Sequence, residues 1–371
     1  MPTIDDLLTT AARENASDVY LKAGGYPVLR IHGDMQAARD WPRLTPEDTA
    51  KIAAAVMNER HKERFKHDAE VDLSYNISGV GRFRCNIHRQ RGTVGIVFRI
   101  ITSNIKTVEE LHLPAVITEI ATERRGMILV TGSTGAGKST TMASMVEQIN
   151  LTRTAHIITI EDPIEFAYKD KKSFVIQREV DSDTLSFKAA LRGALRQNPD
   201  VILVGEMRDV ETVETALMAA SAGTLVMSSL HTLDATETIL RIIGMFPAQQ
   251  QQSIRMMLAS VLKAVISVRL VRTQDGQGRV PAVEILRTSG VIRECIIQPD
   301  RTSTIRDVIA KGGYGMQTFD QALLEHYTQG RITLEDALIY ATIPDDFMLL
   351  VKGLQVAKPG QVLGATIPTT V

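Results

Sequence analysis

The 371-residue sequence contains only two cysteines, Cys85 and Cys295. Two distant thiols cannot supply the four ligands of a zinc ribbon, and they argue against a secreted domain stabilised by disulfides. Aromatic residues make up only 5% of the chain, and the formal net charge is -1. A neutral chain with few aromatic side chains lacks the features that typically bind nucleic acid, so no nucleic-acid partner is expected.

Long apolar runs are also missing, since no stretch approaches the ~20 apolar residues that span a bilayer. The N-terminus, MPTIDDLLTTAARENASDVYL, carries an acidic pair where a signal peptide needs positive charge. With 44% hydrophobic and 23% charged residues, the composition is that of an ordinary globular protein. We therefore expect a cytoplasmic protein, at most peripheral to a membrane, and long enough for two domains.

Residues 1–102 predict a small α+β domain, followed by a linker or hinge over 103–115. Apolar spacing predicts a helix over 4–15. Thr45, Pro46 and Asp48 are typical of a second helix start, because threonine caps the helix and proline suits its first position. Four short apolar segments predict strands, at residues 18–22, 27–32, 81–88 and 93–100.

From residue 116 the pattern changes to strands that alternate with helices, which is typical of a mostly parallel sheet. Four short, β-branched segments predict strands buried on both faces, at residues 127–131, 156–160, 201–204 and 225–230. The fold class is therefore α/β. We expect this second domain to cover 116–354 and to end in helices over 305–352. Residues 355–371 lack periodicity and predict a disordered tail.

Residues 132–139, GSTGAGKS, match the phosphate-binding pattern G-x-x-x-x-G-K-[ST] between a predicted strand and a predicted helix over 140–148. Glycines let main-chain N–H groups turn toward phosphate oxygens, and the helix N-terminus adds positive potential. Lys138 is predicted to contact the β- and γ-phosphates of ATP, and Ser139 to bind Mg²⁺. The alternative is a glycine-rich turn before an ordinary helix. The predicted nucleotide-binding residues of this loop are Ser133, Thr134, Gly135, Ala136, Gly137, Lys138, Ser139 and Thr140.

Acidic residues follow two of the predicted strands at the sheet edge that carries the phosphate loop. Glu161, Asp162 and Glu165 follow one strand, and Glu206 follows another. Carboxyl ends of parallel strands share an edge, and hydrolysis needs groups there that hold metal and orient water. The alternative is that these acids only stabilise helix starts. His231 ends a third strand, as a γ-phosphate sensor or as a structural histidine.

Four segments resemble the secretion ATPase superfamily of type II secretion and type IV pili. The similar motifs are its Walker A at 132–140, its aspartate box at 160–166, its atypical Walker B at 198–209 and its histidine box at 222–232. The resemblance spans about residues 15–350. It implies a PAS-like N-terminal domain, a RecA-like ATPase domain and Mg²⁺-dependent ATP hydrolysis. It also implies that Glu165 is the general base and that Glu206 supports Mg²⁺. His231 belongs to the histidine box, and Lys138 belongs to the same catalytic set.

Within this superfamily the chain is most similar to the PilT-type retraction group. It lacks the long N-terminal region and the four-cysteine insertion of assembly and secretion ATPases, and it has GMQTFD at 315–320 and VIRECI at 291–296. This resemblance implies a homo-hexameric motor for type IV pilus retraction and twitching motility. It implies docking at the inner-membrane base of the pilus, with a platform protein and a paralogous pilus ATPase as partners.

The hairpin around residues 90–92 predicts one apolar and one basic face. The expected apolar set is Phe83, Cys85, Ile87, Val94, Ile96, Phe98 and Ile100. Arg84 and Arg99, and after them Arg82 and Arg91, are candidates to reach the nucleotide at a subunit interface, because planar guanidinium groups suit spread phosphate charge. The alternative is a solvated basic sheet face.

Other functions stay open at this point. Thr224 stands where the histidine box usually has its first histidine, which suggests a PilU-like accessory motor. A pilus-assembly or secretion ATPase, a nucleic-acid translocase and a non-hydrolysing nucleotide-binding regulator are the further alternatives. In the GMQTFD segment, Gly315 is expected to end one helix and Thr318 to cap the next. Its acids and amide are candidates to contact a partner, and the alternative is loop chemistry with no partner.

Overall fold

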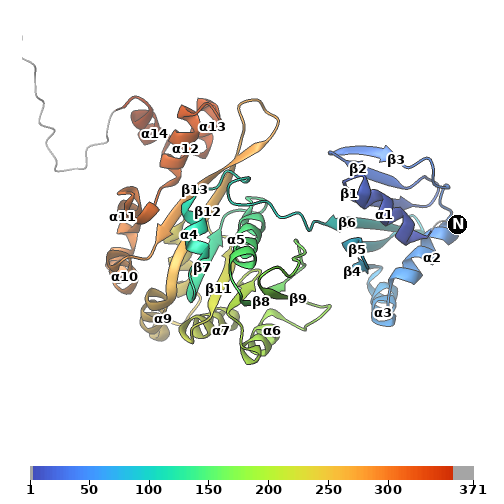
Figure 1. Ribbon diagram of the computed structural model, residues 1–371, viewed down its shortest axis with the longest axis horizontal. Coiled ribbons are helices and arrows are strands. Elements are labelled where there is room, and N and C mark those ends of the chain that lie inside the picture. Colours follow the sequence, from blue (N-terminus) through green and yellow to red (C-terminus); the bar gives the residue numbers. More distant parts are fainter. Residues whose placement is uncertain (1–2, 354–371) are drawn as a thin grey trace, which may run out of the picture.

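The computed structural model describes residues 3–353, and its N-terminal part is a six-stranded sheet with three helices (Figure 1). The strand order is β3-β2-β1-β6-β5-β4, and every neighbouring pair is antiparallel. The strands are β1 (Ala16–Lys22), β2 (Val28–Ile31), β3 (Asp34–Ala37), β4 (Glu70–Ile77), β5 (Gly81–Gln90) and β6 (Thr93–Ile101). The helices are α1 (Ile4–Arg13), α2 (Pro46–Val56) and α3 (Glu59–Asp68).

Helix α2 starts as its sequence predicts. The Thr45 hydroxyl accepts from the Asp48 N–H at 3.1 Å, and the Asp48 carboxylate accepts from the Thr45 N–H at 2.9 Å. Pro46 occupies the first helical position, where its missing N–H costs nothing. Helix α1 begins with the same reciprocal pair, formed by Thr3 and Asp6.

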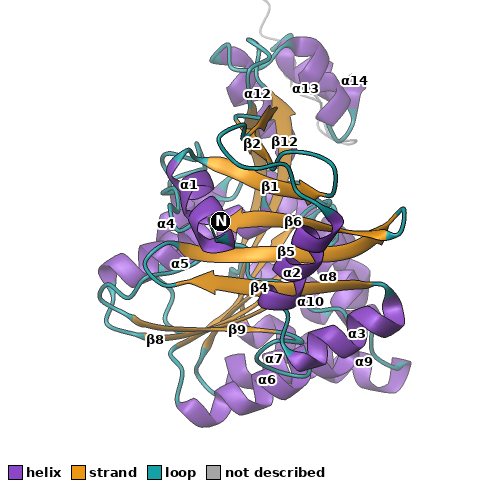
Figure 2. Ribbon diagram, turned by 90° about the vertical axis from the view of Figure 1, so that its right-hand side faces the viewer, coloured by secondary structure: helices purple, strands orange, loops and turns teal. Residues whose placement is uncertain are grey.

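The predicted two-faced hairpin is confirmed on its apolar side. Phe83, Cys85 and Ile87 of β5 are fully buried, together with Ile96 and Phe98 of β6. These side chains form one core with α1 and α2. Figure 2 shows these two helices in front of the sheet. Figure 1 shows the second sheet to the left of the first, on the side away from these helices. The uncovered, arginine-bearing face therefore turns toward the rest of the chain.

The second sheet has seven strands in the order β13-β12-β7-β11-β10-β8-β9. All neighbours are parallel except the β12–β13 hairpin, which confirms the predicted α/β class. The strands are β7 (Gly126–Thr131), β8 (His156–Glu161), β9 (Phe174–Glu179), β10 (Val201–Val204), β11 (Leu225–Leu230), β12 (Leu262–Arg272) and β13 (Arg279–Arg287). The sequence predicts four of these seven strands. It misses the β9 edge and the β12–β13 hairpin.

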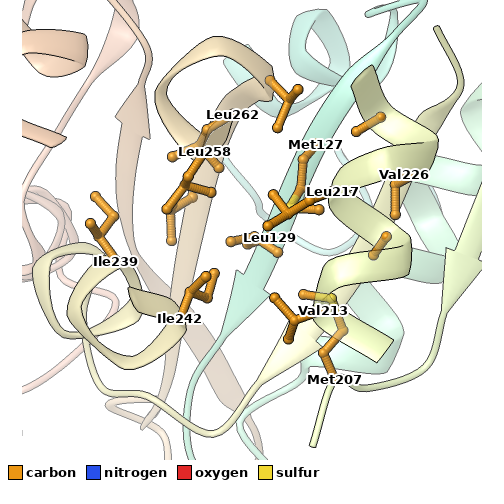
Figure 3. Close-up of a cluster of buried hydrophobic side chains, with 14 of the residues drawn as sticks. Met127, Leu129, Met207, Val213, Leu217, Val226, Ile239, Ile242, Leu258 and Leu262 are labelled. Atoms are coloured by element: carbon orange, nitrogen blue, oxygen red, sulfur yellow. The ribbon is translucent and has the colours of Figure 1, made fainter. Parts of the chain in front are cut away.

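Helices cover both faces of this sheet. Met127 and Leu129 of β7 join one buried cluster, and the alternate residues Ile128 and Val130 join the other. Figure 3 shows the first cluster, in which Leu217 and Ile242 pack over Leu129. The helices are α4 (Val116–Ala121), α5 (Lys138–Thr152), α6 (Phe187–Ala194), α7 (Val210–Ser221), α8 (Ala235–Gly244), α9 (Ala248–Val261) and α10 (Gly290–Ile297), with a 3₁₀ turn at Leu195–Gln197.

The chain ends in a small helical group against β12 and β13 (Figure 1). Its helices are α12 (Phe319–Thr328), α13 (Leu334–Tyr340) and α14 (Pro344–Val351). The preceding helix, α11 (Ile305–Ala310), packs instead with α8 and α10, and 3₁₀ turns lie at Pro299–Thr304 and Gly313–Gly315. Thr318 caps α12 as predicted. Gly315 is the last residue of the short 3₁₀ turn and does not end an α-helix, because α11 stops at Ala310 and Gly312 takes the left-handed conformation after it. The predicted disordered tail, 355–371, lies outside the described residues.

The amide and the acid of the GMQTFD segment are used inside the chain, which favours the alternative that they serve the loop itself. The Gln317 side chain donates to the Val283 carbonyl at 2.8 Å. Asp320, which is 6% exposed, accepts from Arg306 at 3.0 Å and from the Thr342 N–H at 2.8 Å. The segment thus ties the terminal helices to β13.

Within residues 3–353, no helix combines the length and the apolar character needed to cross a membrane.

Candidate active site

The phosphate-loop sequence joins β7 to α5 at the carboxyl edge of the parallel sheet. Helix α5 begins at Lys138, two residues before the predicted start. Gly132 has φ 144°, and a Cβ there would lie 2.5 Å from the Val268 carbonyl oxygen. Gly137, with φ 97°, is the residue before the helix. At these two positions the turn therefore depends on glycine.

A cavity of about 560 Å³ opens in front of this loop. The predicted residues that line it are Thr134, Gly135, Gly137, Lys138, Ser139, Thr140, Glu161, Asp162, Glu165, Glu206, His231 and Arg84. Ser133, Ala136 and Arg99 are not among its lining residues. The loop, three strand ends and one strand of the N-terminal sheet therefore meet at one cavity.

Lys138 lies over the phosphate loop. Its Nζ donates to the carbonyl oxygens of Gly132 and Ser133, both at 2.9 Å, and lies 3.5 Å from Nδ1 of His231. Burial lowers the pKa of Lys138, while the nearby Glu206 and Glu165 carboxylates oppose that shift. The ammonium group is thus held where phosphate oxygens enter the loop.

Glu206 lies at the centre of a chain of charges. Its carboxylate, 13% exposed, forms an ion pair with Arg208 and lies 3.3 Å from Nε2 of His231. His231 therefore bridges Glu206 and Lys138. Arg208 also lines the cavity, but it is not among the residues that the sequence predicts, although it stands two positions after Glu206.

Glu161 and Glu165 differ in burial, although four positions separate them. The Glu161 carboxylate accepts from the Thr159 hydroxyl at 2.6 Å and from the Gln177 amide at 3.3 Å. Burial raises the pKa of Glu161 to about 7. Glu165 is exposed to the cavity, and its backbone N–H points to Glu161 at 3.5 Å. Burial also raises the pKa of Asp162, which lines the cavity.

The candidate arginines of the N-terminal domain separate in the structure. Arg84 lines the cavity of its own chain, whereas Arg99 donates to Asp18 at 2.9 Å. Arg82 pairs with Glu179 at 3.1 Å, and Arg91 lies in the β5–β6 turn. Sequence alternation places Arg82, Arg84 and Arg99 on one face, but it cannot tell which of them reaches the cavity.

Thr224 lies at the opposite edge of the sheet from His231. It immediately precedes β11, its hydroxyl donates to the Pro199 carbonyl at 3.4 Å, and it is buried. His231 follows the other end of the same strand. The residue that departs from the histidine-box pattern therefore does not line the cavity.

A family model described as "Type II/IV secretion system protein" matches residues 1–338. The "Type IV pilus retractation ATPase PilT" of Pseudomonas aeruginosa is 43% identical over 345 residues, which cover 93% of this chain and 99% of that protein. The "Type IV pilus ATPase PilU" of the same organism is 39% identical, covering 94% and 91% of the two chains. A crystal structure titled "Pilus Retraction Motor PilT and Bound ADP" superposes with a TM-score of 0.84 at 47% identity, covering 93% and 99%.

Proposed function

This chain belongs to the type II/IV secretion system protein family, and we propose that it is a hexameric ATPase that drives retraction of type IV pili. One observation carries the ATPase part: Lys138, Glu165, Glu206 and His231 converge on one cavity at the phosphate loop. The likeness to PilT, over nearly the full length of both chains, supports the retraction part.

The phosphate loop fits the phosphates of a nucleotide. A Cβ at Gly135 would meet nothing within 4 Å, so the main chain there is open to the cavity, and the N-terminus of the 15-residue helix α5 follows. N–H groups and the helix dipole bind anions at such a position. Lys138 can exchange its two loop carbonyls for phosphate oxygens, which are stronger acceptors for an ammonium group.

Ser139 and Glu206 are the residues that would hold Mg²⁺, which would neutralise charge on the phosphates. Both line the cavity. Within residues 3–353 no group of three or more His, Cys, Asp or Glu side chains forms a metal cage. This arrangement suits Mg²⁺, because Mg²⁺ at nucleotide sites takes most of its ligands from phosphate and water.

We assign Glu165 as the general base that orients and deprotonates water. Its carboxylate faces the cavity, and no hydrogen bond or ion pair engages that carboxylate within the described part of the chain. Glu161, whose pKa is raised, is instead held by Thr159 and Gln177. His231, between Lys138 and Glu206, is placed to respond to the γ-phosphate.

The remaining parts of the proposal concern assembly. We infer a cytoplasmic homo-hexamer at the inner-membrane base of the pilus, with the platform protein as partner and with a paralogous pilus ATPase beside it. Arg84 lines the cavity of its own chain, so each subunit would bring one arginine of its N-terminal sheet to its own site. Six such subunits closing in turn would convert hydrolysis into movement.

The enzyme is tested with purified protein, ATP and Mg²⁺. Glu165→Gln is expected to lower kcat by about 10²–10⁴-fold, because loss of a general base has that effect. Glu214→Gln, on the exposed side of α7, is the matched control and should hydrolyse ATP at the wild-type rate. An inactive wild-type protein would contradict the ATPase. A fully active Glu165→Gln would contradict the assignment of the base.

Retraction is tested in the cell. Deletion of the gene should abolish twitching and leave excess surface pili, and normal motility with normal pilus number would remove the retraction proposal while leaving the ATPase. The PilU-like alternative rests on Thr224, since the identity to PilU, 39%, is below the 43% identity to PilT. Expression of this chain alone, in a strain without other retraction ATPases, separates the two. Restored motility indicates a main motor, and active ATPase without motility indicates an accessory one.

A further inference from the structure

Glu179 is a buried carboxylate at the end of the edge strand β9, outside the nucleotide cavity. It is 6% exposed. Two of its partners come from the N-terminal sheet: Arg82 lies 3.1 Å from Oε2, and the Ser74 hydroxyl donates to Oε1. A third partner is the Ile164 N–H, which donates to Oε2 at 3.0 Å. One side chain therefore joins the N-terminal domain to the backbone next to Glu165.

The far side of the same loop is attached to the N-terminal domain as well. Thr102, the first residue after β6, pairs with Phe166 as a parallel bridge, and the Ala167 N–H donates to the Thr102 carbonyl at 3.0 Å. Glu165 thus lies between two attachment points. Both attachments reach strands of the N-terminal sheet, β5 through Arg82 and β6 through Thr102.

A buried carboxylate is stable only while it is paired and hydrogen-bonded. If the N-terminal sheet moves away, Glu179 loses both Arg82 and Ser74 and must hydrate, which disturbs its contact to Ile164. Arg84, two residues from Arg82 on the same face of β5, leaves the cavity in the same movement. The position of the N-terminal domain therefore determines both the conformation of the loop that carries Glu165 and whether Arg84 lies in the cavity.

We propose that Glu179 is a positioning residue for ATP hydrolysis, which couples docking of the N-terminal domain, through Arg82 and Ile164, to the placement of Glu165. This inference rests on the proposed ATPase function. It makes hydrolysis conditional on domain closure: ATP binds to the phosphate loop in either position, and water is activated only when the domain is docked.

The test compares steady-state ATP hydrolysis of full-length Glu179→Gln with wild type. The amide keeps the shape but loses the ion pair, so kcat should fall about tenfold to a hundredfold, as misplaced catalytic groups do. KM for ATP should stay within about twofold, because Glu179 does not line the cavity. Arg82→Gln should lower kcat by the same factor. The double variant should be no slower than either single variant, because each of the three proteins lacks the Arg82–Glu179 ion pair.

Asp181→Asn is the matched control, since the Asp181 carboxylate faces Arg64 at 4.0 Å across the same domain boundary and, in the described part of the chain, makes no hydrogen bond or ion pair with residues 161–167. Its kcat should stay within about twofold of wild type. Thermal unfolding of each variant verifies the fold. If Glu179→Gln is unfolded, Arg82→Gln, which leaves the buried carboxylate in place, decides the question.

A second measurement separates positioning from general weakening. In a Glu165→Gln background, Glu179→Gln should cause no further loss of kcat, because the group it positions is already gone. An additional tenfold loss there, a kcat unchanged by Glu179→Gln alone, or a rise in KM that matches the fall in kcat would each overturn the inference. In all three cases wild-type hydrolysis and the loss in Glu165→Gln would still stand, so the proposed ATPase would survive.

Discussion

The two sheets of this protein place functional residues in different ways. The seven-stranded sheet is covered on both faces, and all residues of β7 and β11 are buried. The phosphate loop that carries Lys138 therefore starts from a strand packed on both faces, and His231 directly follows another such strand. The six-stranded sheet buries one face only and offers Arg82 and Arg84 from the other. The site therefore combines a rigid half with a half whose contribution depends on domain position.

The contacts between the two halves are polar and few. They include the buried Glu179–Arg82 pair, the exposed Asp181–Arg64 pair and the backbone pairing of Thr102 with Phe166. Small polar interfaces between domains permit relative motion. The separate apolar clusters of the two halves support the same conclusion, since neither core extends into the other.

Substitution of two arginines on the same sheet face should change kcat by very different amounts. Arg84→Ala should lower kcat by about 10³-fold or more, because a guanidinium group at the transferred phosphate has that effect. Arg99→Ala should change kcat less than about threefold, since its side chain is 65% exposed and pairs with Asp18. ATPase assays at saturating ATP measure both. Equal losses in the two variants would show that the basic face acts as a whole.

The next prediction concerns the independence of the two cores. Phe83→Ala should destabilise the N-terminal domain by about 3–5 kcal/mol, because Phe83 is fully buried there. Trp41, the single tryptophan, packs against the same core, so its fluorescence reports this domain in denaturant.

Ile202→Ala in β10 is the counterpart in the other sheet, where about 2–5 kcal/mol is expected. It should leave the Trp41 transition unchanged while hydrogen exchange in β7 and β10 increases. A Trp41 transition that shifts equally in both variants would contradict independent cores.

The last comparison concerns the pH dependence of the free energy of unfolding, which should have opposite signs for one acid in each domain. The pKa of Glu161 is raised from 4.5 to about 7 by burial. Between pH 4.5 and about 7 the Glu161 carboxyl is protonated in the folded chain but ionised in the unfolded chain. Its contribution to the free energy of unfolding is therefore fully present below pH 4.5 and is lost as pH rises through about 7. The decline is up to about 3 kcal/mol. Glu161→Gln should remove it, as measured by circular dichroism in denaturant at pH 5 and pH 8.

Asp48 in the N-terminal domain has the opposite behaviour, because hydrogen bonds from Thr45 lower its pKa. Its contribution is present above its unfolded pKa of about 3.9 and is lost as pH falls through the lower folded value. Asp48→Asn should therefore narrow the stability difference between pH 5 and pH 3. If Glu161→Gln and Asp48→Asn changed the slope of stability against pH in the same direction, the opposite signs expected for the two acids would be contradicted.

Local sequence rules predicted much of the fold. The capping box at Thr45 and the alternation of Phe83 and Cys85 are set by neighbours within a few residues, and both appear as expected. The strands at the sheet centre are continuous apolar runs, which makes them visible. The edge strand β9 was missed because its half-buried, mixed sequence, FVIQRE, lacks both signals.

The phosphate loop, the acids after two parallel strands and the basic face of the hairpin could all be predicted from residue order, because each depends on neighbours and on periods of two or 3.6. The folded chain was needed to show that Arg84 enters the cavity while Arg99 pairs with Asp18, and that Gln317 and Asp320 turn inward. It was also needed to show that Glu179 meets Arg82, almost a hundred positions earlier. These outcomes depend on which side chains folding brings within about 3 Å of each other, and no local pattern contains that distance.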